Sequence, residues 1–307
     1  MEKNPINLTP FQLQELQNVV ALLTERYSPD KLICFGSLHN SSEAKSCFLP
    51  SENQYRSHYF LLMVTKEAVR IEHDVQDYVT THYTAATITI ISHGSETIGE
   101  AIAKQSRFFI TVYMEGYLLY SADGMPVFFK QKVLQPIDPG QTLQKARKYY
   151  NYRWNMASGF LESAEACWEA GYFNTMAFLL HQAVEQTCNC LIRVFMAYRA
   201  DIHNLDRLLK LCLCFYPGLA IHFPGNTDEE RRLFKLLNSS YSHARYKDDF
   251  DVSSDDADAI MNQVDDFMVL AEVLCQNRIA AYELAAKDAA AQLAEYSPAS
   301  AASMMAG

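Results

Sequence analysis

The sequence predicts a small α/β domain followed by an all-helical domain. Strand patterns alternate with helical patterns as far as about residue 128. The next segment, 131–140, holds two prolines and a glycine, which is typical of a linker. Beyond it, apolar residues recur every three or four positions, as they do along one face of a helix. The expected division is 1–130 for the first domain, 131–140 for the linker, 141–285 for the helical bundle and 286–307 for a mobile Ala- and Ser-rich tail.

The first domain alternates helices and short buried strands. Thr9 and Pro10 suit the start of its first helix. Four apolar residues closed by Gly36 and Ser37 predict a first strand that ends there in a turn, and 38–57 reads as a long polar loop. We expect helices at 8–27, 66–82 and 96–115, and strands at 31–37, 58–64, 87–92 and 117–120.

The second domain shows only helical periodicity. Pro217 and Gly218 should stop its third helix, and Thr227 with Glu230 forms a capping-box pattern at the start of the fourth. We expect helices at 141–170, 174–199, 204–215, 227–243 and 254–285.

Composition limits the function classes. Hydrophobic residues make up 49% of the 307 residues and charged residues 20%, which is typical of a folded protein. The longest apolar stretch is too short to span a bilayer, and no apolar core follows a basic N-terminus, so we expect a cytoplasmic protein without a membrane partner. The net charge of −10 disfavours a large nucleic-acid surface but leaves room for a local basic patch.

Eight cysteines are present, and most lie in apolar runs. Neither Cys-x-Cys pair is joined to a second ligand pair at zinc spacing. Small buried thiols in a reducing compartment are therefore favoured over a metal site. The cysteines are Cys34, Cys47, Cys167, Cys188, Cys190, Cys212, Cys214 and Cys275.

Two segments of the first domain resemble the minimal nucleotidyltransferase fold. They are Phe35-Gly36-Ser37 after the first strand, and the run from Lys104 to Tyr120. The resemblance implies a small mixed sheet, and a Gly-Ser turn that opens a helix whose amides bind nucleotide phosphates. Gly36 and Ser37 are therefore nucleotide-binding candidates, with an ordinary turn as the alternative.

The metal ligands of that family are missing. Its members hold two divalent metals with an Asp-x-Asp pair on the second strand and a third carboxylate on a later strand, whereas the matching residues here are His58-Tyr59-Phe60. We expect no metal, no cofactor and no nucleotidyl transfer. His58 reads as a surface or hydrogen-bonded residue. Weak substitutes are Glu43 and Glu52 for metal, and Lys45, Arg56 and Arg107 for phosphate charge.

Three elements of the second domain resemble HEPN domains, a family of small helical bundles. They are the run 177–186, the histidine-plus-leucine element 203–209, and Tyr241-Ser242-His243-Ala244-Arg245-Tyr246 with the three residues after it. The order of the two domains matches that of nucleotidyltransferase–HEPN proteins of the toxin–antitoxin or defence type. The resemblance also implies a homodimer through the HEPN domain.

Many HEPN domains are metal-independent ribonucleases with an arginine, four to six residues and then a histidine. That spacing is absent, because three residues separate Arg199 from His203, nine separate Arg193 from His203, and ten separate Arg232 from His243. His203, His243 and Arg245 remain weak catalytic candidates for a divergent site.

If the bundle packs as in that family, five side chains should line a shared groove: His181, Glu185, His203, Tyr241 and Arg245. Glu185, Tyr241 and Arg245 are then nucleotide-binding candidates. The plain alternatives are an interhelical ion pair between Glu185 and Arg245, a helix-start hydrogen bond by His203, and a core or edge packing role for Tyr241. Three functions remain open: a non-catalytic nucleotide- or RNA-binding module, a divergent metal-independent RNase, and a homodimeric scaffold.

Overall fold

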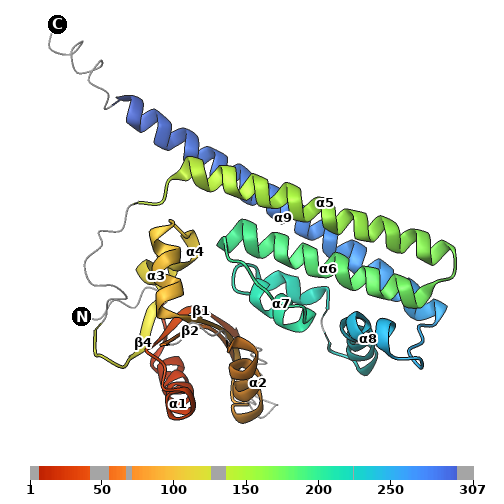
Figure 1. Cartoon of the computed structure of the whole chain (residues 1–307), viewed down its shortest axis with the longest axis horizontal. Coiled ribbons are helices and arrows are strands. Elements are labelled where there is room, and N and C mark those ends of the chain that lie inside the picture. The colour runs from red at the N-terminus through yellow and green to blue at the C-terminus, as the bar shows by residue number, and fades with distance from the viewer. Residues whose placement is uncertain (1–6, 42–54, 67–70, 126–135, 224, 296–307) are drawn as a thin grey trace, which may run out of the picture. The chain divides into compact units, whose positions relative to one another are not determined.

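The computed structural model describes residues 7–41, 55–66, 71–125, 136–223 and 225–295. The chain divides into two compact units, Met1–Gln135 and Pro136–Gly307. Figure 1 shows that the first unit contains the sheet and that the second is built from helices. None of the described helices combines the length and apolar composition needed to cross a membrane.

The first unit is a four-stranded mixed sheet with helices on both faces (Figure 1). The strand order is β3-β2-β1-β4; β2 and β3 run parallel, and β1 is antiparallel to both of its neighbours. The mixed sheet expected for this domain is thereby confirmed. Its elements are α1 (Pro10–Tyr27), β1 (Lys31–Ser41), β2 (Tyr55–Thr65), α2 (Glu72–His82), β3 (Thr87–Gly94), α3 (Ser95–Ala103), α4 (Arg107–Glu115) and β4 (Tyr117–Ser121).

Alternation along the strands builds the core. Successive side chains of β2 point to opposite faces, so Leu61 and Met63 pack with the apolar stripes of α1 and α2. Gly116, between α4 and β4, admits no side chain, because an added Cβ would lie 2.3 Å from the Val112 carbonyl oxygen and 2.6 Å from a methyl of Ile33. The helices and strands therefore approach one another closely at this corner.

The turn expected at Gly36 and Ser37 is not formed. Both residues lie inside β1, with Gly36 opposite Phe60 and Ser37 opposite Tyr59, and the register shifts between Cys34 and Gly36. The ladder with β2 continues to Ser41, so polar residues that read as loop become strand. The loop prediction for 38–57 was therefore wrong at both ends, and its middle, 42–54, lies outside the described residues.

The helix expected over 96–115 is two helices. Gln105, between α3 and α4, has a left-handed backbone with φ of 58°. A left-handed residue ends a right-handed helix, and the chain restarts as α4 at Arg107. The periodicity on either side is helical, which is why the sequence pattern does not reveal the break.

The second unit is a helical bundle around α6. This helix packs against α5, α7, α8 and α9, which explains why it is apolar on nearly all sides. The expected helices are present, and the last is longer than predicted. The elements are α5 (Pro139–Glu169), α6 (Phe173–Met196), α7 (Leu205–Cys212), the 3₁₀ turn η1 (Pro217–Ile221), α8 (Asp228–Tyr246) and α9 (Ser254–Glu295).

Local signals at the helix starts are confirmed. Thr9 and Thr227 each form a full capping box, with Gln12 and Glu230 as the reciprocal partners. The cysteine prediction also holds for most of the described thiols. Cys34, Cys188, Cys190, Cys212 and Cys275 are buried, Cys167 and Cys214 are half-buried, and Cys47 lies outside the described residues.

Candidate functional site

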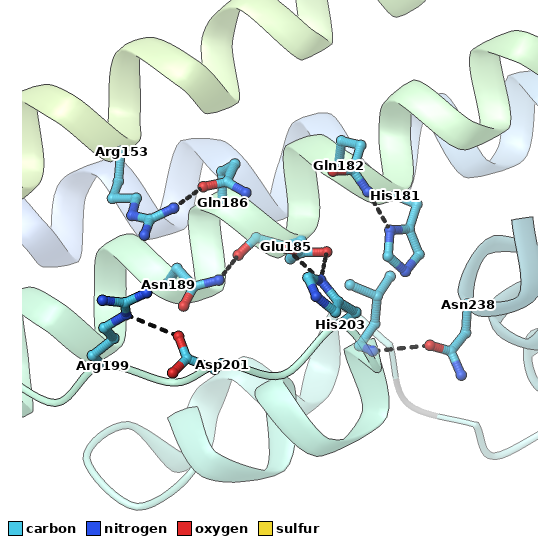
Figure 2. A network of polar contacts seen from close by, with 11 residues as sticks. Arg153, His181, Gln182, Glu185, Gln186, Asn189, Arg199, Asp201, His203 and Asn238 are labelled. Carbon is cyan, nitrogen blue, oxygen red and sulfur yellow. Dashed lines mark hydrogen bonds and ion pairs between the residues drawn. The ribbon is translucent and has the colours of Figure 1, made fainter. Parts of the chain in front are cut away.

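Polar side chains from α6 and the segment after it meet along one side of the bundle (Figure 2). His181, Glu185 and Asn189 are spaced by four residues on α6, so they lie on the same face of the helix. All three are buried, although α6 is otherwise mostly apolar. Buried polar groups are retained where they have partners, which directs attention to the contacts of this face.

Glu185 and His203 form the central pair. Nδ1 of His203 lies 3.2 Å from each carboxylate oxygen of Glu185. The Glu185 side chain is 7% exposed, whereas that of His203 is 62% exposed. A carboxylate on one ring nitrogen fixes the orientation of an imidazole. The pair therefore has a buried acid and an accessible ring.

Asn204, and not His203, caps α7. Its side-chain oxygen accepts from the Arg207 amide at 3.0 Å, and Asn238 of α8 accepts from the Leu205 amide at 2.9 Å. The helix-start role considered for His203 was therefore wrong, because the next residue already satisfies the first turn. His203 is left to bond Glu185.

Tyr241 of α8 stacks on two histidine rings. Its ring centroid lies 5.2 Å from that of His203 with an interplanar angle of 6°, and 5.2 Å from that of His181 at 30°. The guanidinium of Arg245 lies 4.3 Å from the Tyr241 centroid. The residue is only half-buried, so it forms the partly accessible centre of an aromatic and cationic group rather than a core packing residue.

The ion pair expected between Glu185 and Arg245 is replaced by other contacts. Glu185 binds His203, and Nε of Arg245 donates to the Tyr241 carbonyl oxygen at 2.7 Å. Arg245 also lies over Tyr246 at 5.0 Å and Phe178 at 5.5 Å. Within the described ranges no carboxylate lies at ion-pair distance from Arg245, which is exposed. Its positive charge is therefore available to an anion.

His181 adds a neutral group beneath Tyr241. Burial lowers the pKa of His181 to about 4, and the charges of His203 and Arg245 act in the same direction. The ring is therefore uncharged at neutral pH. We call His181, Glu185, His203, Tyr241 and Arg245 the stacking cluster, and the structure brings all five together as expected.

His243 does not join the stacking cluster. It lies two positions from Tyr241 on α8, so it points to a different side of the helix, and its ring meets Phe250 at 6.0 Å. The prediction that grouped His243 with His203 and Arg245 was therefore wrong for this residue.

The first unit offers no equivalent arrangement at Gly36 and Ser37. Because both lie within β1, the described backbone there opens no helix. Arg107 begins α4, the side chain of Arg56 is not described, and Glu43, Lys45 and Glu52 lie outside the described residues. The phosphate cradle implied by the resemblance is therefore not formed by this strand.

Polar groups near the missing metal ligands are bonded to one another. Glu15 of α1 accepts from Ser57 Oγ at 2.8 Å and from the Tyr59 hydroxyl at 2.5 Å, and burial raises the pKa of Tyr59. The expectation that His58 is hydrogen-bonded is confirmed, since its Nε2 lies 2.8 Å from Thr89 Oγ1. In the described part of the chain, no three His, Cys, Asp or Glu side chains gather as a metal site would require.

Sequence reasoning did not place three arginines beside the stacking cluster, because it considered Arg193 and Arg199 only for their spacing to His203 and did not consider Arg153. Arg153 of α5 donates to Gln186 at 2.5 Å, and Arg199 pairs with Asp201 at 2.9 Å (Figure 2). The guanidinium of Arg193 of α6 lies 4.5 Å from the ring centroid of Tyr149 on α5. The signal for Arg193 was available, because it continues the four-residue spacing of Glu185 and Asn189.

Comparison with known proteins identifies the bundle. Residues 150–274 match the family model of the HEPN domain, so the chain carries a HEPN domain in its second unit. No curated protein matches the sequence. Among solved structures, a nucleotidyltransferase-like protein from Exiguobacterium sibiricum 255-15 is similar, with 7% identity over 87% of this chain and 78% of that chain, and a TM-score of 0.28. The assignment of the bundle rests on the family match.

Proposed function

We propose that this chain, which carries a HEPN domain over residues 150–274, is a nucleotide- or RNA-binding module that binds without turnover. The stacking cluster is the proposed site. The observation that carries the proposal is Tyr241, whose half-buried ring lies parallel to exposed His203 with the Arg245 guanidinium at 4.3 Å.

Each part of the stacking cluster suits one part of a nucleotide. Aromatic rings stack on bases, and such a contact contributes about 1–3 kcal/mol per base. An arginine without a carboxylate partner binds phosphate through its planar set of donors. Glu185 supplies acceptor oxygens for donors on a base or a ribose. A HEPN domain that follows a degenerate nucleotidyltransferase-like unit further supports a role in the toxin–antitoxin or defence class.

The proposal is tested by binding to the purified full-length chain. Thermal shift with nucleoside mono-, di- and triphosphates, each with Mg²⁺ and with EDTA, should show a metal-independent rise in melting temperature. Tyr241→Leu should require at least ten times as much ligand for the same rise in melting temperature. Tyr172→Leu, which removes an exposed tyrosine elsewhere in the unit, should leave it unchanged. Equal binding by both variants would contradict the proposal. It would also be contradicted if the unmodified chain showed no shift with any nucleotide and no binding of a short RNA.

A metal-independent RNase is the second candidate, and the Glu185–His203 pair favours it. An accessible imidazole oriented by a buried carboxylate is suited to proton transfer. Arg245 would then stabilise phosphate charge. This candidate predicts RNA cleavage in EDTA that is lost in His203→Gln, whereas the binding module predicts intact RNA. His243→Gln is the matched control, since it lies outside the stacking cluster.

A homodimer through the HEPN domain remains a prediction, as do the cytoplasmic location and the scaffold role. Light scattering on the purified chain would give twice the monomer mass if the homodimer forms. A monomer that still binds nucleotide would separate binding from assembly. A dimer that binds neither nucleotide nor RNA would favour the scaffold.

A further inference from the structure

One hydrogen bond joins α8 to the segment that carries His203. The backbone amide of Leu205 donates to Oδ1 of Asn238 at 2.9 Å, across 33 positions of sequence. Figure 2 shows this contact near the Glu185–His203 pair. A backbone amide can only donate, so the bonded atom of Asn238 must be its side-chain oxygen. Asn238 therefore ties α8 to the start of α7.

The two ends of this bond lie next to the two stacked rings. Leu205 follows His203 by two residues, and its side chain is completely buried, so the backbone here is anchored in the core. Asn238 precedes Tyr241 by three residues, and residues three apart lie on the same side of a helix. The bond therefore sets the position of the His203 backbone relative to that of Tyr241.

The stack of the two rings depends on this relative position. The rings of His203 and Tyr241 are inclined by 6°, and their centroids are 5.2 Å apart. Glu185 bonds one nitrogen of the imidazole, but it belongs to α6 and fixes the ring relative to that helix. Asn238 supplies the complementary restraint, because it fixes the segment that carries the imidazole relative to α8.

Neighbouring side-chain bonds have other roles. Asn204 accepts from the Arg207 amide at 3.0 Å and so satisfies the first turn of α7 from within the helix. Ser240 is buried and donates to the Ala177 carbonyl oxygen at 2.9 Å, which ties α8 to α6. Neither bond connects α8 to the segment that carries His203. The bond of Asn238 is distinguished by joining the elements that carry the two rings.

We propose that Asn238 is a positioning residue of the stacking cluster, whose bond to the Leu205 amide holds the ring of His203 parallel to that of Tyr241. The positioning is a property of the free chain and does not depend on the identity of a ligand. Its effect on binding rests on the proposed function, because a ligand that stacks on these rings meets a surface whose geometry Asn238 sets.

The test measures the ring-proton chemical shifts of His203 by NMR, in the full-length chain labelled with ¹³C in its histidine rings. A proton above the face of an aromatic ring is shielded, so Tyr241→Leu should move the His203 signal downfield, and His203→Gln identifies that signal. Asn238→Leu, which is similar in size and lacks the acceptor, should cause most of the same movement. Asn238→Ala should do so too, whereas Asn238→Asp keeps an acceptor oxygen and should retain the shielded position.

Binding and stability separate positioning from simple stabilisation. Asn238→Leu should weaken binding of adenosine triphosphate in EDTA about fivefold, because part of a stacking contact is lost. Asn204→Ala is the matched control, since it removes a bond to another amide in the first turn of the same helix. Both substitutions should lower the melting temperature by about 2–4 °C. Asn204→Ala should nevertheless leave the His203 signal and the affinity for adenosine triphosphate unchanged.

Different results overturn different parts. If Asn238→Leu and Asn238→Ala lower the melting temperature but leave the His203 signal in place, Asn238 is structural and the inference is wrong. It is also wrong if Asn238→Asp moves the signal as far as Asn238→Leu does, because the acceptor is then not the cause. If the His203 signal responds as expected while the unmodified chain binds neither nucleotide nor RNA, the positioning role stands and the proposed function fails.

Discussion

Each unit of the chain contains a buried glutamate on a helix, and the two glutamates differ in whether their hydrogen-bond partners are buried or exposed to solvent. Glu15 binds Ser57 and Tyr59, which are themselves buried. Glu185 binds His203, whose ring is mostly exposed. The first carboxylate closes a hydrogen-bond group inside the fold, whereas the second holds a ring at the surface. The exposure of the partner, rather than burial of the acid, separates a structural group from a candidate site.

The same contrast extends to charge and stacking. Around Glu15, the hydroxyls of Ser57, Tyr59 and Tyr83 donate hydrogen bonds to the glutamate side chain or its backbone carbonyl. Beside Glu185, Arg245 and Arg193 have no carboxylate at ion-pair distance among the described residues, whereas Arg199 pairs with Asp201. Substitutions in the first group should therefore affect stability, and those in the second should affect binding.

The largest expected effect is the loss of stability of the second unit in acid. The pKa of His181 is about 4 in the folded chain and about 6.5 when unfolded. Between these values the unfolded chain binds more protons than the folded chain. The free energy of unfolding is therefore not reduced by His181 above pH 6.5, and it falls by about 3 kcal/mol as the pH decreases towards 4. Urea unfolding monitored at several pH values measures this. His181→Gln should flatten the dependence, and an unchanged slope would show that other groups cause it.

Glu15→Ala should destabilise the first unit by about 2 kcal/mol, because the hydroxyls of Ser57 and Tyr59 lose their acceptor while they stay buried. Glu25→Ala, at an exposed position of the same helix, is the control and should change stability by less than about 0.5 kcal/mol. Chemical denaturation measures both. RNA or nucleotide binding by the second unit should be unaffected, and a loss of binding in Glu15→Ala would erase the distinction between the two glutamates.

The two capping boxes allow a matched test in both units. Thr9→Ala and Thr227→Ala should each cost about 1 kcal/mol, because each leaves amides of a first helical turn without an acceptor. Thermal unfolding followed separately in the sheet and in the bundle should assign each loss to its own unit. If either substitution lowers both transitions equally, the units unfold together.

The smallest expected effect on stability is that of Glu185→Gln. The amide oxygen still accepts from His203, and water reaches the exposed ring, so the free energy of unfolding should change by less than about 1 kcal/mol. Affinity for RNA should nevertheless fall, because the imidazole is less firmly oriented. Denaturation and fluorescence anisotropy of a labelled short RNA, measured on the same preparation, compare the two. A loss of stability as large as that of Glu15→Ala would indicate that Glu185 is structural.

Local patterns in the sequence predicted the features of the fold that depend on residues close together in the chain. The helix caps at Thr9 and Thr227 and the apolar face of α6 were predictable in this way, whereas the group of five residues in the HEPN domain was expected from the family resemblance. The continuation of β1 through Ser37 was not, because it depends on Tyr59, 22 positions further along the chain. The break at Gln105 leaves the helical periodicity intact on both sides.

The finer contacts of the site depend on packing between segments. Glu185 and His203 are 18 positions apart, and nothing in either local pattern pairs them in preference to Glu185 and Arg245. Arg153, Arg193 and Arg199 come from α5, α6 and the segment after α6, so no single stretch of sequence contains them. The family resemblance located the residues, and the tertiary structure decided their partners.

The length of α9 has a consequence for how the bundle opens. The helix has 42 residues, yet Ile279 is its last buried apolar side chain, and Leu284 and Leu293 are exposed. A helical segment without packing is only marginally stable in water. Its final turns should therefore exchange amide hydrogen for deuterium within seconds, while the turns around Phe267 remain protected, so that a single helix carries a gradient of local unfolding free energy along its axis.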